Sequence, residues 1–279
     1  MPEHLQEAEG MGLYIKRTIP YKYVPNTPAN LVSLDLYSYA PLASLKPVVL
    51  YVHGGGWATG DKANKLANKL ALFQSLDYLF VSVNYRLSPT PAALTDGNRI
   101  KYPVHSTDVA DAVKWVADSI GRYGGDPAKI VLLGHSAGAH LVALTGTSPL
   151  FLPARHLPLT FLRGIAAIDT EGYDVLTQSS EELYQNAFGT DPAQQREASP
   201  VYNVTSAARY PRFFVATRGS AARVALADAF VKQLQAAGVP VSQVRGSQYD
   251  HEGINNAIGD PQDTVITPAL TAFLAAAFQ

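Results

Sequence analysis

The sequence predicts an α/β fold in which a mostly parallel central sheet carries helices on both faces. Short, unbroken apolar runs, such as Val-Val-Leu-Tyr-Val at 48–52, are typical of strands that are buried on both faces. These runs alternate along the chain with longer segments of helical spacing, and such alternation builds parallel sheets. With 279 residues, 47% of them hydrophobic and 16% charged, the chain can bury a large core, and we expect one domain over 1–279.

The individual elements follow from the same patterns. We expect an opening ribbon of two strands at 13–23 and 31–39, because both segments are rich in β-branched and aromatic residues and a Pro-Asn-Thr-Pro turn separates them. Further strands are expected at 48–52, 78–85, 129–134, 164–169, 212–217 and 239–246, and helices at 61–76, 106–120, from 136 onward, at 223–237 and at 263–278. Roughly forty residues separate the strands at 164–169 and 212–217, so we expect a small cap insertion at about 170–210.

Composition and charge limit the classes of partner. The 22 basic residues nearly balance the 23 acidic ones and form no basic run, which argues against nucleic acid and favours a small-molecule ester as partner. There is no cysteine, so disulfides, thiolate nucleophiles and cysteine-based zinc sites are excluded. The polar segment 1–10 and the lack of any long apolar run predict no membrane span and a cytoplasmic protein, or a secreted one if a signal peptide was removed. Both a monomer and a homodimer fit the sequence.

The candidate nucleophile is Ser136. It lies in Gly-His-Ser-Ala-Gly at 134–138, which fits the G-x-S-x-G pattern, between an apolar strand and a helical segment. A serine on such a sharp turn is lifted above the edge of the sheet, and the flanking glycines leave room for the crowded backbone. The competing interpretation is a glycine-rich turn with an ordinary helix-capping serine.

A second glycine-rich motif, His-Gly-Gly-Gly-Trp at 53–57, ends the buried strand at 48–52. A loop with no side chains can direct backbone N–H groups at a developing oxyanion, so we expect the amides of Gly55 and Gly56 to act with that of Ala137 as an oxyanion hole. Trp57 and His135 are the candidate substrate-binding residues of the two motifs. From the cap segment, Tyr173 and Tyr184 are expected to line the same site.

The general base is expected to be a histidine, because the pKa of imidazole lies close to neutral pH. Five of the seven histidines lie in the tail, in the two backbone motifs, ahead of Ser136 or on its own helix: His4, His53, His105, His135 and His140. In hydrolases with a serine on a strand-to-helix turn, the histidine comes last in the chain, after the final strand. His156 comes too early for this order, whereas His251 stands in a loop just after the final strand and is the candidate base.

Taken in order, these motifs resemble the α/β-hydrolase superfamily, in particular its esterase and lipase branch of hormone-sensitive-lipase-like and kynurenine-formamidase-like proteins. The resemblance also includes Gly-Asp at 60–61, Asn-Tyr-Arg-Leu-Ser-Pro at 84–89 and Gly-Gly-Asp-Pro at 124–127. It implies an α/β-hydrolase fold with Ser136 as nucleophile, His251 as base, and no metal or organic cofactor. It also implies that Asp126 has a structural role in a turn.

The acid of the triad is the open point. Relatives usually carry it just after the strand that here ends at residue 217, but this chain has Ala222 at that position. Two other acids are disfavoured, one because it lies a turn into the next helix and one because it adjoins the histidine: Asp228 and Asp250. Asp169 ends the preceding strand on the same edge of the sheet and is our choice, with Glu171 and Asp174 as alternatives.

Three functions are compatible with these observations. The first is a serine hydrolase that cleaves carboxylic esters of small to medium acyl or aryl substrates through an acyl-enzyme on Ser136. An arylformamidase, which would hydrolyse N-formyl anilides with the same residues, is the second. The third is a catalytically weak binding protein, which the missing acid after the strand at 212–217 favours.

Overall fold

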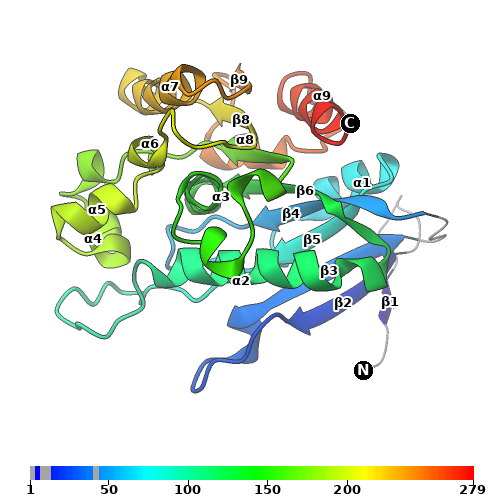
Figure 1. Ribbon diagram of the computed structural model, residues 1–279, viewed down its shortest axis with the longest axis horizontal. Helices are drawn as coiled ribbons and strands as arrows, with labels where there is room; N and C mark the ends of the chain where they lie inside the picture. The colour runs from blue at the N-terminus through cyan, green and yellow to red at the C-terminus, as the bar shows by residue number, and fades with distance from the viewer. Residues whose placement is uncertain (1–3, 7–13, 40–43) are drawn as a thin grey trace.

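One sheet of nine strands forms the centre of the protein in the residues that the computed structural model describes, 4–6, 14–39 and 44–279 (Figure 1). The strand order is β1-β2-β3-β5-β4-β6-β7-β8-β9. The pairs β1–β2, β2–β3 and β3–β5 are antiparallel, and every later pair is parallel. The strands are His4–Gln6 (β1), Tyr14–Pro20 (β2), Ser33–Tyr39 (β3), Lys46–Val52 (β4), Leu79–Val83 (β5), Gly125–His135 (β6), Gly164–Ile168 (β7), Arg212–Thr217 (β8) and Val241–Arg245 (β9). The predicted fold class is confirmed.

Helices cover both faces of the sheet (Figure 1). They are Ala67–Ser75 (α1), Val104–Ser119 (α2), Ala137–Thr147 (α3), Glu182–Phe188 (α4), Pro192–Glu197 (α5), Pro200–Asn203 (α6), Ala221–Ala236 (α7), His251–Asn256 (α8) and Ile266–Ala277 (α9). Apolar side chains of α2, α3 and α7 pack in the core on one face, and those of α1 and α9 pack in the core on the other.

The central strand β4 shows why its sequence is apolar at every position. Val48, Leu50 and Val52 belong to the core beneath α2 and α3, whereas Val49 and Tyr51 belong to the core beneath α1 and α9. Successive side chains of a strand point to opposite faces, so a strand covered on both sides must be apolar throughout. This constraint is what made the run at 48–52 recognisable in the sequence.

The helix expected at 61–76 begins later than predicted, because α1 starts at Ala67. Ahead of it, the Asp61 carboxylate accepts hydrogen bonds from the backbone N–H of Ala63 at 2.9 Å and from the side-chain amide of Asn84 at 2.8 Å. Lys65 has a φ of 54°, which is incompatible with a right-handed helix. The prediction for 61–66 is therefore wrong, since side-chain hydrogen bonds hold this segment in turns.

The loop expected around His251 is also a helix, because α8 begins at His251 itself. The carboxylate of Asp250 caps it by accepting the N–H of Gly253 at 2.6 Å. An aspartate at this position satisfies one of the amides that the first turn of a helix leaves without a partner. Asp250 thus has a capping role, and His251 starts from a fixed backbone.

The segment between β7 and β8 contains α4, α5 and α6, which Figure 1 shows grouped beside α3. Its role as a cap stays a prediction. At the other end of the chain, segment 1–10 lies outside the described residues except for β1, and so does Leu13, the first residue of the predicted opening ribbon. The rest of that ribbon is confirmed by the antiparallel pairing of β2 with β3.

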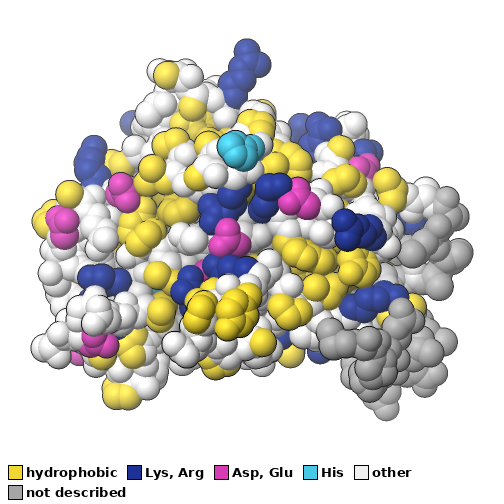
Figure 2. Space-filling view, turned by 60° about the horizontal axis from the view of Figure 1, so that its bottom comes forward, with side chains coloured by type: hydrophobic (Ala, Val, Ile, Leu, Met, Phe, Trp, Pro, Cys, Tyr) yellow, Lys and Arg dark blue, Asp and Glu magenta, His cyan; other side chains and the backbone are white. Residues whose placement is uncertain are grey.

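On the face that Figure 2 shows, apolar side chains are interspersed with charged groups of both signs. This mixture agrees with a formal net charge of −1. Among the helices of the described residues, none combines the length and the apolar character that a crossing of the bilayer would demand.

A buried lysine joins α1 to the helix that begins with His251. Lys69 is fully buried, and its ammonium group donates a hydrogen bond of 3.0 Å to the carbonyl oxygen of Asn255 in α8. The same group lies 5.1 Å from the centre of the Tyr51 ring. Burial, with a smaller contribution from the charge of Lys65, lowers the pKa of Lys69 to about 7.

We expect Lys69 to make stability rise with pH. Its pKa is lower in the folded chain than in the unfolded one, so between about pH 7 and 10.5 the unfolded chain binds more protons and the free energy of unfolding increases. Urea unfolding of the wild type and Lys69→Met at pH 7 and 9.5 measures this. The wild type should gain about 1–3 kcal/mol relative to the variant over that interval. A constant difference would show that the buried amine does not titrate in this range.

Candidate active site

Ser136 occupies a strained turn between β6 and α3, with a φ of 56° and a ψ of −121°. The backbone on either side is crowded. A Cβ on Gly138 would lie 2.0 Å from the carbonyl oxygen of Val52 in β4, and one on Gly134 would lie 2.3 Å from the carbonyl oxygen of Gly138. Both distances are far below van der Waals contact, so both positions require glycine. The sequence pattern G-x-S-x-G is thus enforced by backbone packing.

The three predicted triad residues are joined by hydrogen bonds. The Ser136 hydroxyl lies 2.9 Å from Nε2 of His251, and Nδ1 of the same ring lies 2.6 Å from Oδ2 of Asp169. Since the carboxylate can only accept, Nδ1 donates to it and Nε2 is left to accept the serine proton. Asp169 is fully buried, whereas His251 and Ser136 are partly exposed and accessible to a ligand.

The Asp169 carboxylate is also paired with two arginines from the loop and helix that follow β8. Nε of Arg218 lies 2.8 Å from Oδ2, and Nε of Arg223 lies 2.8 Å from Oδ1. Burial alone would raise the pKa of Asp169, but the hydrogen bonds from His251 and Arg223 and the nearby positive charges together lower it well below its ordinary value. The carboxylate is therefore ionised near neutral pH.

The other candidate acids are engaged elsewhere. Glu171 pairs with Arg223 at 2.5 Å, and Asp174 accepts a hydrogen bond from the hydroxyl of Tyr202 at 2.9 Å. Asp228 lies on the exposed face of α7 and pairs with Arg245. The acid-free position noted in the sequence, Ala222, is in the first turn of α7.

The loop at 53–57 runs beside Ser136. Gly55 and Gly56 have φ values of 113° and 59°, which favour glycine. Within the described residues, no hydrogen bond engages the N–H groups of Gly55, Gly56 or Ala137. Gly56 and Ala137 border the cavity that also contains Ser136, whereas Gly55 borders a neighbouring one.

Trp57 is held in place from two sides. Its indole N–H donates to Nδ1 of His140 at 3.2 Å, and Nε2–H of His140 donates to the carbonyl of Ala198, in the insertion, at 2.8 Å. Burial lowers the pKa of His140 to about 4, which keeps the ring neutral and able to make both bonds. The indole also packs edge-on against Tyr184 and Phe188 of α4.

Of the aromatic residues expected around the site, Trp57 and Tyr184 border the cavity beside Ser136. Tyr173 is instead buried against Phe230, with ring centres 4.7 Å apart, because the insertion folds back on α7 there. The expectation for Tyr173 is therefore wrong.

His135 lies behind His251 rather than in the cavity with Ser136. The two rings are 4.6 Å apart, and Nε2–H of His135 donates to the backbone carbonyl of His251 at 2.8 Å. Burial and then the neighbouring His251 lower the pKa of His135 to about 4, so the ring is neutral near pH 7. In this position it supports the backbone of the candidate base.

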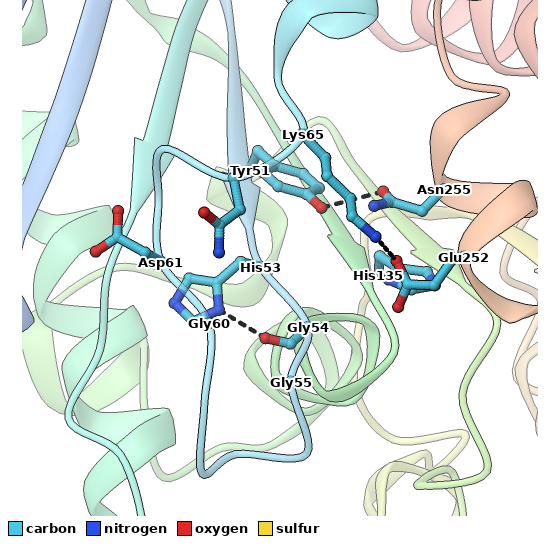
Figure 3. A pocket seen from close by; sticks show the side chains of 11 residues that line it. Tyr51, His53, Gly54, Gly55, Gly60, Asp61, Lys65, His135, Glu252 and Asn255 are labelled. Atoms are coloured by element: carbon cyan, nitrogen blue, oxygen red, sulfur yellow. Dashed lines mark hydrogen bonds and ion pairs between the residues drawn. The ribbon is translucent and has the colours of Figure 1, made fainter.

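Two small cavities border the loop at 53–57, which we call the oxyanion loop after its predicted role. The cavity beside Ser136 has a volume of about 150 Å³ and is bordered by Trp57, Leu183 and Tyr184 among others. Figure 3 shows the other, of about 140 Å³, with the imidazoles of His53 and His135 on its walls. Gly55 of this loop borders the cavity of Figure 3, and Gly56 borders the cavity beside Ser136.

His135, Asp169 and His251 could in principle hold a metal ion, because one ligand atom from each lies within 4.8 Å of the others. Their hydrogen bonds to one another, and the two arginines on Asp169, would have to be displaced first. The arrangement fits a proton relay better than a cation site.

Comparisons with known proteins agree with this fold. The BD-FAE family matches residues 34–151. Over its full length the chain resembles the crystal structure of a thermostable esterase from Pseudomonas putida ECU1011, with a TM-score of 0.69 and 21% identity over 98% of this chain and 83% of that one. The chain has the α/β-hydrolase fold. This is the fold that the motifs of the sequence predicted.

Curated relatives of this chain include two proteins of Mycobacterium tuberculosis. Esterase LipQ is 36% identical over 48% of this chain, and the probable carboxylic ester hydrolase LipM is 37% identical over 40% of it. The chain spans only 30% and 25%, respectively, of the length of these relatives.

The candidate site includes supporting residues that we did not predict as functional. Tyr85 stacks on His53 at 4.6 Å and donates to its carbonyl at 3.1 Å, which fixes the start of the oxyanion loop. The motif at 84–89 was the signal for this role. The sequence indicated Arg218 and Arg223 less clearly: they are two basic residues on either side of Ala222, the position where an acid was expected.

Replacement of Gly138 by alanine should destabilise the fold, because the new Cβ would meet the backbone of β4, which cannot move aside. We expect a loss of about 3 kcal/mol or more in the free energy of unfolding, measured by urea denaturation. Gly121→Ala is the matched control, since a Cβ there meets open space, and it should change stability by no more than about 0.5 kcal/mol. Equal effects of the two variants would contradict the close approach of α3 to β4.

Proposed function

We propose that this α/β-hydrolase is a serine esterase that cleaves carboxylic esters of small to medium acyl or aryl substrates. The observation that carries the proposal is the continuous row of hydrogen bonds from Ser136 through His251 to Asp169. Such a row activates a serine hydroxyl for attack on an acyl carbon. The esterase names of LipQ and LipM support the same reaction. A homodimeric state and a cytoplasmic location remain predictions of the sequence.

The reaction proceeds in two halves. Oγ of Ser136 attacks the ester carbonyl carbon while Nε2 of His251 takes the hydroxyl proton. The tetrahedral intermediate collapses, the bond to the alcohol oxygen breaks, and the imidazolium gives its proton to the departing alcohol. Water then attacks the acyl-serine with the same proton transfers, which releases the carboxylic acid and restores Ser136. Asp169 stays ionised throughout and holds the ring in the required tautomer.

Charge that develops on the carbonyl oxygen would be stabilised by backbone donors. The N–H groups of Gly56 and Ala137 border the cavity with Ser136 and are free to donate, and that of Gly55 is the next along the loop. Preorganised donors of this kind contribute about 3–4 kcal/mol each to the transition state. Trp57 shapes the wall for the acyl group, and His135 contributes by holding the backbone of His251.

The two alternatives differ in their support. An arylformamidase would use the same residues on an anilide bond, so only substrate preference separates it from an esterase. The binding-protein alternative arose from the missing acid after β8. Its basis is weaker now, because Asp169 makes the hydrogen bond to His251 that the missing acid would have made.

We expect hydrolysis of p-nitrophenyl acetate and butyrate to depend on the triad. Ser136→Ala should abolish turnover, and Asp169→Asn should lower kcat by about 10³–10⁴-fold, because the ring loses its fixed tautomer. Asp228→Asn removes an exposed carboxylate that is paired with Arg245, so it is the control and should match the wild type.

Each outcome of this assay separates the functions. Turnover by the wild type that persists in Asp169→Asn would remove Asp169 from the triad and leave the esterase standing. Faster cleavage of N-formyl anilides than of aryl esters would indicate an arylformamidase. A wild type no more active than Ser136→Ala on either substrate class would favour the binding protein.

Leu183 should limit the length of the acyl group. It is half exposed and lies directly over Gly56, where a Cβ would be 2.8 Å from its Cδ1. Leu183→Ala should raise kcat/KM for p-nitrophenyl hexanoate relative to acetate by about threefold to tenfold, as expected for one or two accommodated methylenes. Leu150→Ala, at an equally exposed leucine away from the cavity, should leave this ratio unchanged. An unchanged ratio in Leu183→Ala would place the acyl group elsewhere.

A further inference from the structure

The geometry points to Arg218 and Arg223 as positioning residues that hold the Asp169 carboxylate in front of His251 and offset its negative charge there. This inference rests on the proposed esterase function. Neither arginine touches a reacting atom, and both act through Asp169. They come from the loop and helix after β8, the region from which the relatives' acid usually comes.

The two arginines leave the carboxylate one orientation. Nε of Arg223 binds Oδ1 at 2.8 Å, and Nε of Arg218 binds Oδ2 at 2.8 Å, the oxygen that also accepts Nδ1–H of His251. Rotation of the carboxyl group would break all three bonds at once. Charge-assisted bonds of this geometry are the strong ones, and they act here on a buried group.

Arg223 also fixes the backbone that carries the acid. Its Nη2 donates to the carbonyl oxygen of Asp169 at 3.1 Å, and its Nη1 pairs with Glu171 at 2.5 Å. Asp169 has a φ of 55°, in the left-handed region that residues with a side chain adopt less often than glycine, and the bond from Arg223 to its carbonyl oxygen holds it there. One guanidinium thus binds the side chain, the backbone and the following acid of the same turn.

The arginines also offset the charge that would stabilise a protonated His251. On this side of the ring lie Asp169, Glu171, Arg218 and Arg223, two charges of each sign. A lone aspartate would favour the imidazolium, whereas an aspartate neutralised by arginine favours it less. Removal of either positive charge should therefore raise the pH at which His251 loses its proton.

Groups on the other sides of His251 do not change this sign. His135 is buried and neutral, and Lys65 pairs with Glu252 at the surface. Asp250 caps α8, and Tyr184 of α4 is an uncharged phenol near neutral pH because burial raises its pKa. The charges of Arg218 and Arg223 are therefore the ones to remove by substitution when their effect on the protonation of His251 is tested.

The test compares charge with geometry at both positions. Arg218→Gln and Arg223→Gln remove the positive charge. Arg218→Lys and Arg223→Lys keep the charge but lose the planar guanidinium group and its fixed set of N–H donors. The pH profile of kcat/KM for p-nitrophenyl acetate is measured for all four. In parallel, the imidazole of His251 is titrated by NMR in a Ser136→Ala background, which needs no turnover.

We expect the glutamine variants to shift the acid limb of the profile and the His251 titration upward by about 0.5–1 pH unit. The lysine variants should keep both near the wild type while kcat falls about tenfold or more from the lost orientation. Arg245→Gln, which removes an exposed arginine paired with Asp228, is the control and should change neither. Arg218 has a partly exposed side chain and only one acidic partner, so its variants serve if those of Arg223 do not fold.

The outcomes separate this inference from the proposed function. Glutamine variants with a wild-type acid limb and titration would overturn it even while ester hydrolysis continues. Glutamine and lysine variants that lose activity equally, with no shift in either curve, would make the arginines merely structural. A wild type without esterase activity would end the proposed function, whereas the NMR titration would still decide whether the arginines set the protonation of His251.

Discussion

The close approach of three backbone segments at the end of β4 and β6 is the constraint on which the site depends. Gly138, in the first turn of α3, lies against the carbonyl of Val52, and Gly54 of the oxyanion loop lies against the side chain of Ser136. No side chain fits between these segments. Ser136 and the loop at 53–57 are therefore held together by packed main chain, which is more rigid than side chains and does not depend on solvent.

The local parts of the site could be predicted from the sequence, because their cause is local. Glycines at a strand-to-helix turn and at the end of an apolar strand are needed for steric reasons that neighbouring residues reveal. The start of α1 and the existence of α8 could not be predicted in this way. Asp61 is bound by Asn84, which is distant in sequence, and Asp250 reads as a cap only once the helix that it begins is known.

The candidate acid, Asp169, was the hardest site residue to predict from the sequence, because the pairing of strands decides which strand ends lie next to His251. β7 and β8 are parallel neighbours, so their carboxyl ends lie about one strand spacing, 4.8 Å, apart at the same edge. His251, on the segment that follows β9, can therefore reach an acid at the carboxyl end of β7 or at that of β8. An alanine where an acid is expected therefore does not mean that the triad is lost, and the neighbouring strand that precedes it in the chain must be inspected before such a chain is regarded as inactive.

The contacts of Trp57 mean that the loop at 53–57 and the insertion between β7 and β8 cannot change independently in evolution. Through His140 the indole is linked to the backbone at Ala198, and through its ring to Phe188, so the insertion and the oxyanion loop share one rigid contact. Substitutions that move α4 or α5 would also move the backbone N–H groups of Gly55 and Gly56, which we propose as donors in the reaction. New substrate ranges in such proteins should arise first at rim positions outside this contact, and wholesale replacement of the insertion should require compensating changes in the loop.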